Sequence, residues 1–205
     1  IPDVTASAEA ICSGGTSNVL ITNPNGVAGT SFSWVLGTVT GTVAGQSVGS
    51  GNVISQTLTS VAGGSVEYLI TPTANGCSPA GTFSVVVTVD PNPVGTPVPA
   101  GTLFECSGTT LAITPVSSVP STTFVWVGDN GSGGTGDITD TPINAGSTSI
   151  DVTYTVTPVA AGCSGTPVDV IVTVDPIPDV LAGNETICSG GTSNVVITNP
   201  NGVAG

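Results

Sequence analysis

The chain has 205 residues, of which 13 are acidic and none is lysine, arginine or histidine, and its formal net charge is -13. Proteins bind nucleic acids and anionic lipid surfaces through cationic side chains, so both classes of partner are excluded. A serine or cysteine nucleophile needs a neighbouring base, and histidine and lysine are both absent. We therefore expect no enzymatic activity in this segment.

The composition favours an all-β fold. Apolar residues make up 39% of the chain and aromatic residues 4%, beside 29 glycines and 16 prolines. Short β-rich segments separated by glycine and proline turns are typical of sandwiches and barrels. No segment reaches the roughly 18 consecutive apolar residues of a membrane-spanning helix, so no membrane insertion is expected.

The first predicted domain begins with a linker and a short strand that leads to Cys12. A second strand follows, and a third carries Phe32 and Trp34, which are two residues apart and therefore share a face. After a stretch rich in glycine, threonine and serine, two segments alternate between apolar and polar residues, at 66–71 and 83–89. A pattern of about seven short strands predicts an immunoglobulin-like sandwich.

The second predicted domain repeats these features. Its Cys-Ser-Gly segment begins at Cys106, its Phe-x-Trp pair is Phe124 and Trp126, and its alternating segments are 150–157 and 168–174. Seven of the eight aromatic residues of the chain fall at inward-facing positions. They form the predicted core: Phe32, Trp34, Tyr68, Phe83, Phe124, Trp126 and Tyr154.

The beginning of the chain returns at its end. Residues 177–205 are identical to residues 1–29 at 24 of 29 positions, at a constant offset of 176. Such a period is typical of a repeat array, and here it indicates that a two-domain unit was duplicated as a block. We expect a piece of a longer array. Its predicted parts are domain 1 at 1–91, domain 2 at 92–176, and an incomplete third domain at 177–205.

The five cysteines are expected to form disulfides, because the chain contains no close Cys-x-x-Cys pair of the kind that binds metal. Two pairings are open. In the first, each domain closes its own bond, Cys12–Cys77 and Cys106–Cys163, and Cys188 pairs outside the segment. In the second, Cys12 pairs with Cys163 between the domains, and Cys106 pairs with a cysteine of the next period.

Strand direction bears on this choice. If the domains follow one another head to tail, Cys12 and Cys77 lie at opposite ends of a strand, about 25 Å apart. A disulfide needs its Cα atoms within about 7 Å. The between-domain pairing avoids this conflict. However, a first strand that is short, bent or doubled back would bring Cys12 closer to Cys77 and allow the within-domain pairing. The residues alone leave both pairings open.

The acidic residues are the candidate metal ligands, because calcium takes about six to eight oxygen ligands from carboxylates, amides and carbonyls. Their spacing matches no known calcium-loop motif, and solvated acids at strand ends are the simpler interpretation. Calcium is the only cofactor considered. The candidates lie in one glycine-rich loop and at the linkers: Asp129, Asn130, Asp137, Asp140, Asp90, Asn92, Asp175 and Asp179.

Four motifs occur together along the chain: Cys-Ser-Gly, Phe-x-Trp, Tyr-x-x-Thr-Pro-x-Ala-x-Gly-Cys and Val-x-Val-x-Val-Asp-Pro-x-Pro. In this combination the chain resembles the PKD-like and related Ig-like repeats of giant Bacteroidota surface proteins. The resemblance covers the whole chain. It implies a secreted stalk, filament or adhesin at the cell surface, exported by the type IX route.

Two Asp-Pro-x-Pro linkers, at 90–93 and 175–178, add a mechanical expectation. Proline fixes φ and restricts the residue before it, so these junctions are expected to be stiff. Each domain should span about 40 Å and each period about 80 Å. We expect a structural fibre whose partners are other copies or neighbouring repeats.

The alternative is a carbohydrate-binding or other ligand-binding module with surface glycans as partners. Sugar binding would need an exposed aromatic platform, and Phe104 is the one aromatic residue outside a core-like position.

Overall fold

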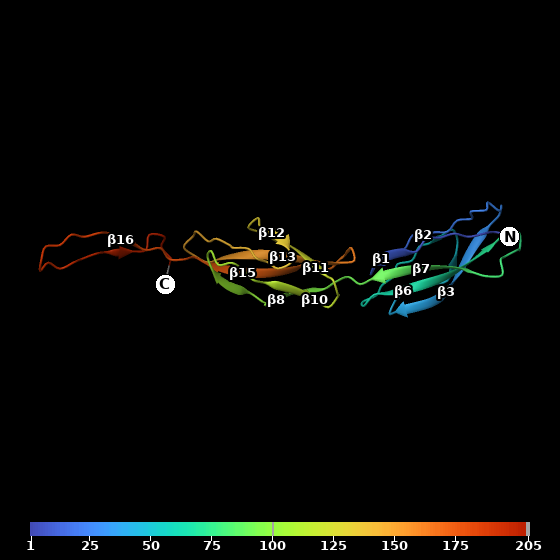
Figure 1. Cartoon of the computed structure of the whole chain (residues 1–205), viewed down its shortest axis with the longest axis horizontal. Helices are drawn as coiled ribbons and strands as arrows, with labels where there is room; N and C mark the ends of the chain where they lie inside the picture. The colour runs from blue at the N-terminus through green and yellow to red at the C-terminus, as the bar shows by residue number, and fades with distance from the viewer. Residues whose placement is uncertain (100, 204–205) are drawn as a thin grey trace. The chain divides into compact units, whose positions relative to one another are not determined.

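The computed structural model describes residues 1–99 and 101–203, and these residues form β-strands, turns and loops (Figure 1). The predicted all-β architecture of tandem Ig-like sandwiches is confirmed. No helix of the described residues is long and apolar enough to cross a membrane. The chain divides into two compact units. The first comprises Ile1–Val94, Val119–Thr122 and Val159–Gly165, and the second comprises Gly95–Ser118, Thr123–Pro158 and Thr166–Gly205.

The first sandwich contains seven strands among its described residues. Its larger sheet has the order β1-β7-β6-β3-β4, and β2 pairs with β5 separately. The strands are β1 (Glu9–Cys12), β2 (Val19–Leu20), β3 (Ser31–Gly41), β4 (Gly49–Ser50), β5 (Val53–Ile54), β6 (Gly64–Thr73) and β7 (Phe83–Asp90).

Strict alternation along the two central strands builds the core of this sandwich. Val66, Tyr68 and Ile70 of β6 are fully buried, whereas the residues between them are partly exposed. Apolar side chains of both sheets meet in one cluster with them. Among the predicted core aromatics of this domain, Phe32, Trp34 and Tyr68 are buried and Phe83 is half-buried.

The second sandwich repeats this topology with different strand lengths. Its larger sheet has the order β12-β11-β13-β15-β9, with β14 added to β13, while β8 pairs with β10. Phe124, Trp126 and Tyr154 are buried in its core. The strands are β8 (Gly95–Val98), β9 (Leu103–Cys106), β10 (Thr114–Ser117), β11 (Thr123–Gly128), β12 (Gly133–Thr135), β13 (Ile150–Ala160), β14 (Cys163–Ser164) and β15 (Val168–Asp175).

In both sandwiches the first strand of the larger sheet runs parallel to the last. In the β1–β7 pair, Cys12 is level with Asp90, and in the β9–β15 pair, Cys106 is level with Asp175. Since paired parallel strands run in one direction, each of these cysteines lies at the end of the sandwich where the last strand ends.

Residues 177–203 repeat the local structure of the chain's beginning. Here β16 (Leu181–Ala182) pairs with β17 (Ile197–Thr198). The Asp179 backbone donates to the Asn201 side chain, as the Asp3 backbone donates to Asn25. However, Ile197 is 70% exposed, whereas Ile21, its equivalent in the first sandwich, is 2% exposed. The hydrogen bonds of this segment are thus local, whereas burial of its apolar side chains needs the remaining strands.

Each tryptophan packs against a glycine on the neighbouring edge strand. A Cβ atom on Gly49 of β4 would lie 2.5 Å from Cζ2 of Trp34, and one on Gly134 of β12 would lie 2.8 Å from Cζ2 of Trp126. The Trp34 indole also donates to the backbone carbonyl of Ser47, and the Trp126 indole donates to the backbone carbonyl of Asp137. Glycine therefore lets an edge strand cover the indole closely.

We predict that Gly49→Ala destabilises the first sandwich by about 1–3 kcal/mol, because the added methyl group must displace a buried indole ring. Gly81→Ala is the matched control, since nothing lies within 4 Å of its Cβ position. Denaturant unfolding followed by tryptophan fluorescence measures both variants. Equal stability of the two variants would contradict this account of Gly49.

Candidate functional site

A tight turn at the end of β1 fixes the position of Cys12. The N–H of Gly15 donates to the carbonyl of Cys12 at 2.8 Å, and Gly14 has a φ of 87°. A positive φ at the third position of such a turn is the type II geometry, which glycine adopts without steric cost. The N–H of Ser13 donates to the carbonyl of Asp90 at 2.8 Å, which ties the turn to the end of β7.

The same turn occurs at two further Cys-Ser-Gly segments, 106–108 and 188–190. Thr109 donates to the carbonyl of Cys106 at 3.0 Å, and Gly191 donates to that of Cys188 at 2.9 Å. The glycines at the third position of these turns, Gly108 and Gly190, have φ values of 79° and 83°. In the second sandwich, Ser107 donates to the carbonyl of Asp175 at 2.8 Å, as Ser13 does to that of Asp90. The tripeptide therefore holds Cys12, Cys106 and Cys188 in one geometry, whereas the Cys-Ser-Gly at 163–165 begins in strand β14.

The remaining two cysteines close a different turn. Ala74 and Cys77 exchange backbone hydrogen bonds of 2.9 and 3.0 Å across Asn75 and Gly76, whose φ values are 48° and 78°. Two successive positive φ values define a type I′ hairpin turn, for which Asn-Gly is the favoured pair.

The second sandwich has the same hairpin turn. There Ala160 pairs with Cys163 across Ala161 and Gly162, whose φ values are 51° and 79°. Cys163 therefore occupies in this turn the position that Cys77 occupies in the first sandwich.

The structure contains one disulfide among its described residues, between Cys12 and Cys163, with Cα atoms 5.5 Å apart. This is the second of the two predicted pairings, and the pairs Cys12–Cys77 and Cys106–Cys163 do not form. Cys77, Cys106 and Cys188 carry exposed free thiols. Cys163 is 1% exposed.

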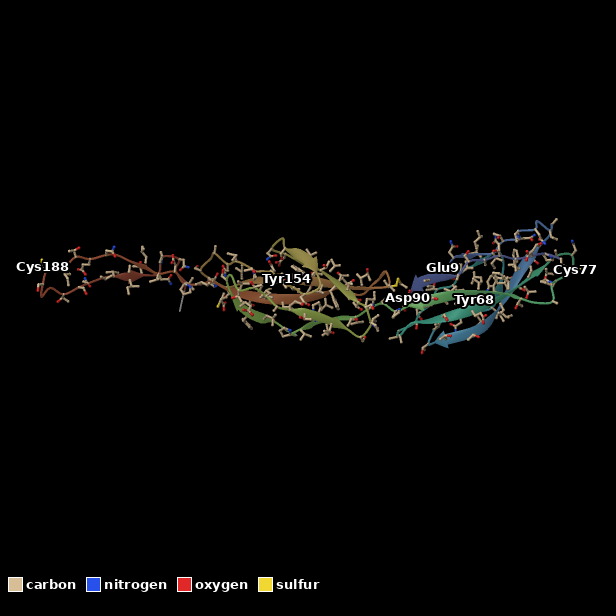
Figure 2. The ribbon with its side chains drawn as sticks, viewed as in Figure 1. Glu9, Tyr68, Cys77, Asp90, Tyr154 and Cys188 are labelled. Carbon is tan, nitrogen blue, oxygen red and sulfur yellow. A yellow bond between two sulfur atoms is a disulfide. The ribbon has the colours of Figure 1, made fainter. Side chains whose placement is uncertain are left out.

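Strand geometry explains why the within-domain bond is absent. Cys12 lies beside the last residue of β7, whereas Cys77 precedes the first residue of that strand, Phe83. An eight-residue strand spans about 25 Å, far beyond the roughly 7 Å that a disulfide allows. Figure 2 shows Cys77 and Asp90 at opposite ends of the first sandwich.

The second sandwich contains a partly buried polar network around Asp140. The Tyr154 hydroxyl and the Asn130 side-chain nitrogen each donate to Oδ2 of Asp140 at 2.7 Å, and the Thr141 backbone donates to Oδ1 at 2.8 Å. Tyr154 also meets Trp126 edge to face, with ring centroids 5.9 Å apart. The network fastens the loop between β12 and β13 to the core; Tyr154 is labelled in Figure 2.

Burial and their shared hydrogen bond shift the pKa values of the Asp140 and Tyr154 side chains. Burial raises the pKa of Asp140, but the hydrogen bonds from Asn130, Tyr154 and its other donors outweigh burial and hold this pKa below its usual value. Burial, and then the hydrogen bond to Asp140 and its negative charge, raise the pKa of the Tyr154 hydroxyl. The carboxylate therefore stays ionised and the phenol stays protonated at neutral pH.

The first sandwich uses a neutral partner at the corresponding place. The Tyr68 hydroxyl donates to Oε1 of Gln56 at 2.8 Å, and the side-chain nitrogen of Gln56 donates to the carbonyl of Ser47 at 2.7 Å. Burial raises the pKa of Tyr68 to about 12. Neither tyrosine partner is predicted from the sequence, because Gln56 and Asp140 lie on loops whose return over the sheet leaves no periodic signal.

Of the four calcium candidates in the glycine-rich loop, the structure brings Asn130 and Asp140 together as donor and acceptor. Both oxygens of Asp140 accept hydrogen bonds, from Asn130 and Tyr154 at Oδ2 and from the Thr141 backbone at Oδ1. Asp129 and Asp137 are exposed. A calcium site at this loop stays a prediction.

The linker candidates are also separately engaged. The Ser149 hydroxyl donates to Asp175, and Asp179 accepts a hydrogen bond from the next backbone N–H. Asp90 contributes its backbone carbonyl to Ser13, and Asn92 donates to the carbonyl of the same serine. Within residues 1–99 and 101–203, no three histidine, cysteine or acidic side chains gather as a metal site.

The surface offers no aromatic platform for a sugar within the described residues. Phe104 is 71% exposed, but the other aromatic side chains are buried or, for Phe83, half-buried. A single ring is a weak basis for carbohydrate recognition.

We predict that Asp140→Asn destabilises the second sandwich at neutral pH by about 1–3 kcal/mol, because charge-assisted hydrogen bonds to a partly buried network are weakened. Asp137→Asn, in the same loop and exposed, is the matched control. Urea unfolding of the full chain at neutral pH compares the two, and an equal loss in both variants would contradict the role of Asp140.

The pH dependence follows from the depressed pKa of Asp140. Its contribution is complete above the usual pKa of 3.8 and is lost as the pH falls through the lower folded-state pKa. The difference between wild type and Asp140→Asn should therefore shrink in strong acid. A difference that stays constant down to about pH 2 would contradict this assignment.

Comparison with known proteins places these features in context. The family model described as a PKD-like domain matches the chain twice, over residues 9–93 and 104–178. These ranges contain β1 to β7 and β10 to β15. A search of curated proteins finds no match.

Solved structures give distant likenesses. Fibronectin(III)-like modules of Clostridium thermocellum CbhA are 14% identical, with 85% of this chain and 95% of that chain covered, at a TM-score of 0.41. An I-band fragment of titin is 13% identical, with 87% and 66% covered, at a TM-score of 0.40. A fragment of mouse cadherin-23 is 14% identical, with 87% and 67% covered, at a TM-score of 0.35.

Proposed function

Because the chain belongs to the PKD-like domain family, we propose that it is a structural repeat segment of a long extracellular surface fibre, stalk or adhesin. The observation that carries this proposal is the return of residues 1–29 at residues 177–205, which repeats sequence, turn geometry and hydrogen bonds together. Duplication of a two-domain block adds length and no new kind of site.

The cysteines support an extracellular setting. Disulfides form and persist in oxidising compartments such as the cell exterior, and are rare in the cytosol. The Cys12–Cys163 bond closes a loop with a sequence separation of 151 residues, so it is a structural bond and not a local redox pair. The resemblance to repeats of giant Bacteroidota surface proteins motivates the more specific proposal of a secreted, surface-attached fibre.

The chemistry of the side chains favours mechanical work over catalysis. PKD-like modules are typically non-catalytic, and this chain has no histidine or lysine to act as a base. Its uniform negative charge keeps separate fibres apart by repulsion. The partners that we propose are other copies or neighbouring repeats of the same protein, joined end to end within one fibre.

Electron microscopy of the native assembly tests this proposal. We predict thin threads with an axial repeat of about 80 Å, which is the length of two sandwiches with their linkers. A calcium chelator should leave the threads unchanged, because the Asp140 carboxylate is engaged by hydrogen-bond donors. Isolated compact particles without an axial repeat would contradict the fibre. Collapse of the threads on chelation would show that bound calcium stabilises them.

A further inference from the structure

We propose that the free thiols of Cys106 and Cys77 are the two halves of a repeating staple, in which Cys106 of one period bonds to the Cys77 equivalent of the next period. The bond between Cys12 and Cys163 is then one member of a continuous series along the fibre. This inference deepens the proposed function, and it adds a covalent link from each period to the next.

Cys106 is equivalent to the bonded Cys12. Both cysteines end the strand that runs parallel to the last strand, level with Asp90 or Asp175. Both begin a type II turn closed by a hydrogen bond to the cysteine carbonyl. The serine hydroxyl that follows accepts a backbone N–H in both sandwiches, at 2.9 Å after Cys12 and 2.8 Å after Cys106. The two thiols are therefore presented in the same way.

Cys77 is equivalent to the bonded Cys163. Each cysteine closes a type I′ hairpin whose two central residues have positive φ. Each is paired with an alanine at the first position of the turn, Ala74 or Ala160. Cys163 is 1% exposed in its disulfide, whereas Cys77, at the same place in the first sandwich, is exposed.

A neighbouring turn extends this equivalence beyond the hairpin. Residues 119–122 belong with residues 159–165 to the compact unit that contains Cys12. In that turn the Thr122 hydroxyl donates to the Val119 carbonyl at 2.6 Å, and in the first sandwich the Thr30 hydroxyl donates to the Val27 carbonyl at 2.7 Å. The first sandwich thus presents both turns that accompany Cys163.

The linker after the second sandwich resembles the linker after the first. Asp175-Pro-Ile-Pro leaves the second sandwich as Asp90-Pro-Asn-Pro leaves the first. The Asn201 side chain donates to the Ile177 carbonyl at 2.7 Å, as Asn25 donates to the Ile1 carbonyl at 3.1 Å. Residues 177–203, which follow the second sandwich, therefore begin in the same way as the sandwich whose hairpin carries Cys77.

Formation of the staple balances as thiol–disulfide exchange. The Cys106 thiolate attacks glutathione disulfide, forming a mixed disulfide and releasing one glutathione thiolate. The Cys77 thiolate of the next copy then attacks the Cys106 sulfur and releases the second glutathione. Two protein thiols are oxidised, and one glutathione disulfide is reduced to two glutathione molecules.

Two copies of the full chain test the pairing in solution. In Cys188→Ser, the free thiols that remain are Cys77 and Cys106, and glutathione disulfide is the oxidant. A protease that cleaves before aspartate separates residues 3–89 from residues 90–128, so each cross-link gives its own peptide pair. Unselective oxidation yields the mixed link at roughly twice the amount of each symmetric link, and the staple predicts an excess of about tenfold or more over each of them.

Variants that keep one thiol are the matched controls. Cys77→Ser with Cys188→Ser can form only the symmetric link through Cys106, and Cys106→Ser with Cys188→Ser only the symmetric link through Cys77. Both should stay monomeric under conditions in which Cys188→Ser alone forms a ladder of chains. Symmetric dimers as abundant as the mixed link would overturn the proposal.

A chain that carries residues 1–176 twice before residues 177–205 gives the second arm, in which the staple is intramolecular. Peptide mapping should show Cys106 of the first copy bonded to Cys77 of the second. Absence of that bond overturns the staple, whatever the two-copy experiment gives. Threads with an axial repeat near 80 Å in a protein that lacks the bond would leave the fibre intact and remove only the staple.

Discussion

The parallel pairing of the first strand with the last decides where the cysteines of each sandwich lie. Because β1 runs beside β7, the residue that ends β1 lies beside the residue at which the chain leaves the sandwich. β9 and β15 repeat this arrangement in the second sandwich. A first strand in the opposite direction would have placed Cys12 beside the hairpin of its own domain, within reach of Cys77.

Two kinds of turn convert this constraint into a defined cysteine geometry. The type II turn needs glycine at its third position, and Gly14, Gly108 and Gly190 supply it after Cys12, Cys106 and Cys188. The type I′ turn needs positive φ at both central residues. Asn75-Gly76 supplies the favoured pair, whereas Ala161 adopts the left-handed region at a steric cost. The hairpin geometry is thus kept in the second domain although its sequence is less suited to it.

The tyrosine networks show how the two sandwiches keep one architecture with different chemistry. Tyr68 and Tyr154 lie at equivalent places on β6 and β13, and each hydroxyl donates to a residue on a loop. The acceptor is neutral Gln56 in one case and ionised Asp140 in the other. Both arrangements satisfy a hydroxyl that burial would otherwise leave unpaired, at a cost of about 1–3 kcal/mol.

The sequence predicted the features that follow from periodicity. Alternation placed Tyr68 and Tyr154 in the core, and the 176-residue offset revealed the duplication. The disulfide was not decided, because the choice depends on the direction of a four-residue strand whose pairing no local pattern records. The hydrogen bond from Tyr154 to Asp140 leaves no signal in the sequence, because the two residues are 14 positions apart on different elements and only the folded loop brings them together.

The central claim is the bond between Cys12 and Cys163, and peptide mapping of the unreduced chain tests it most directly. In Cys77→Ser, cleavage before aspartate leaves Cys12 as the one cysteine of residues 3–89 and Cys163 as the one cysteine of residues 151–168. The account predicts that these two peptides remain joined until a reductant is added. Two free peptides, or residues 3–89 joined to residues 90–128, would contradict it.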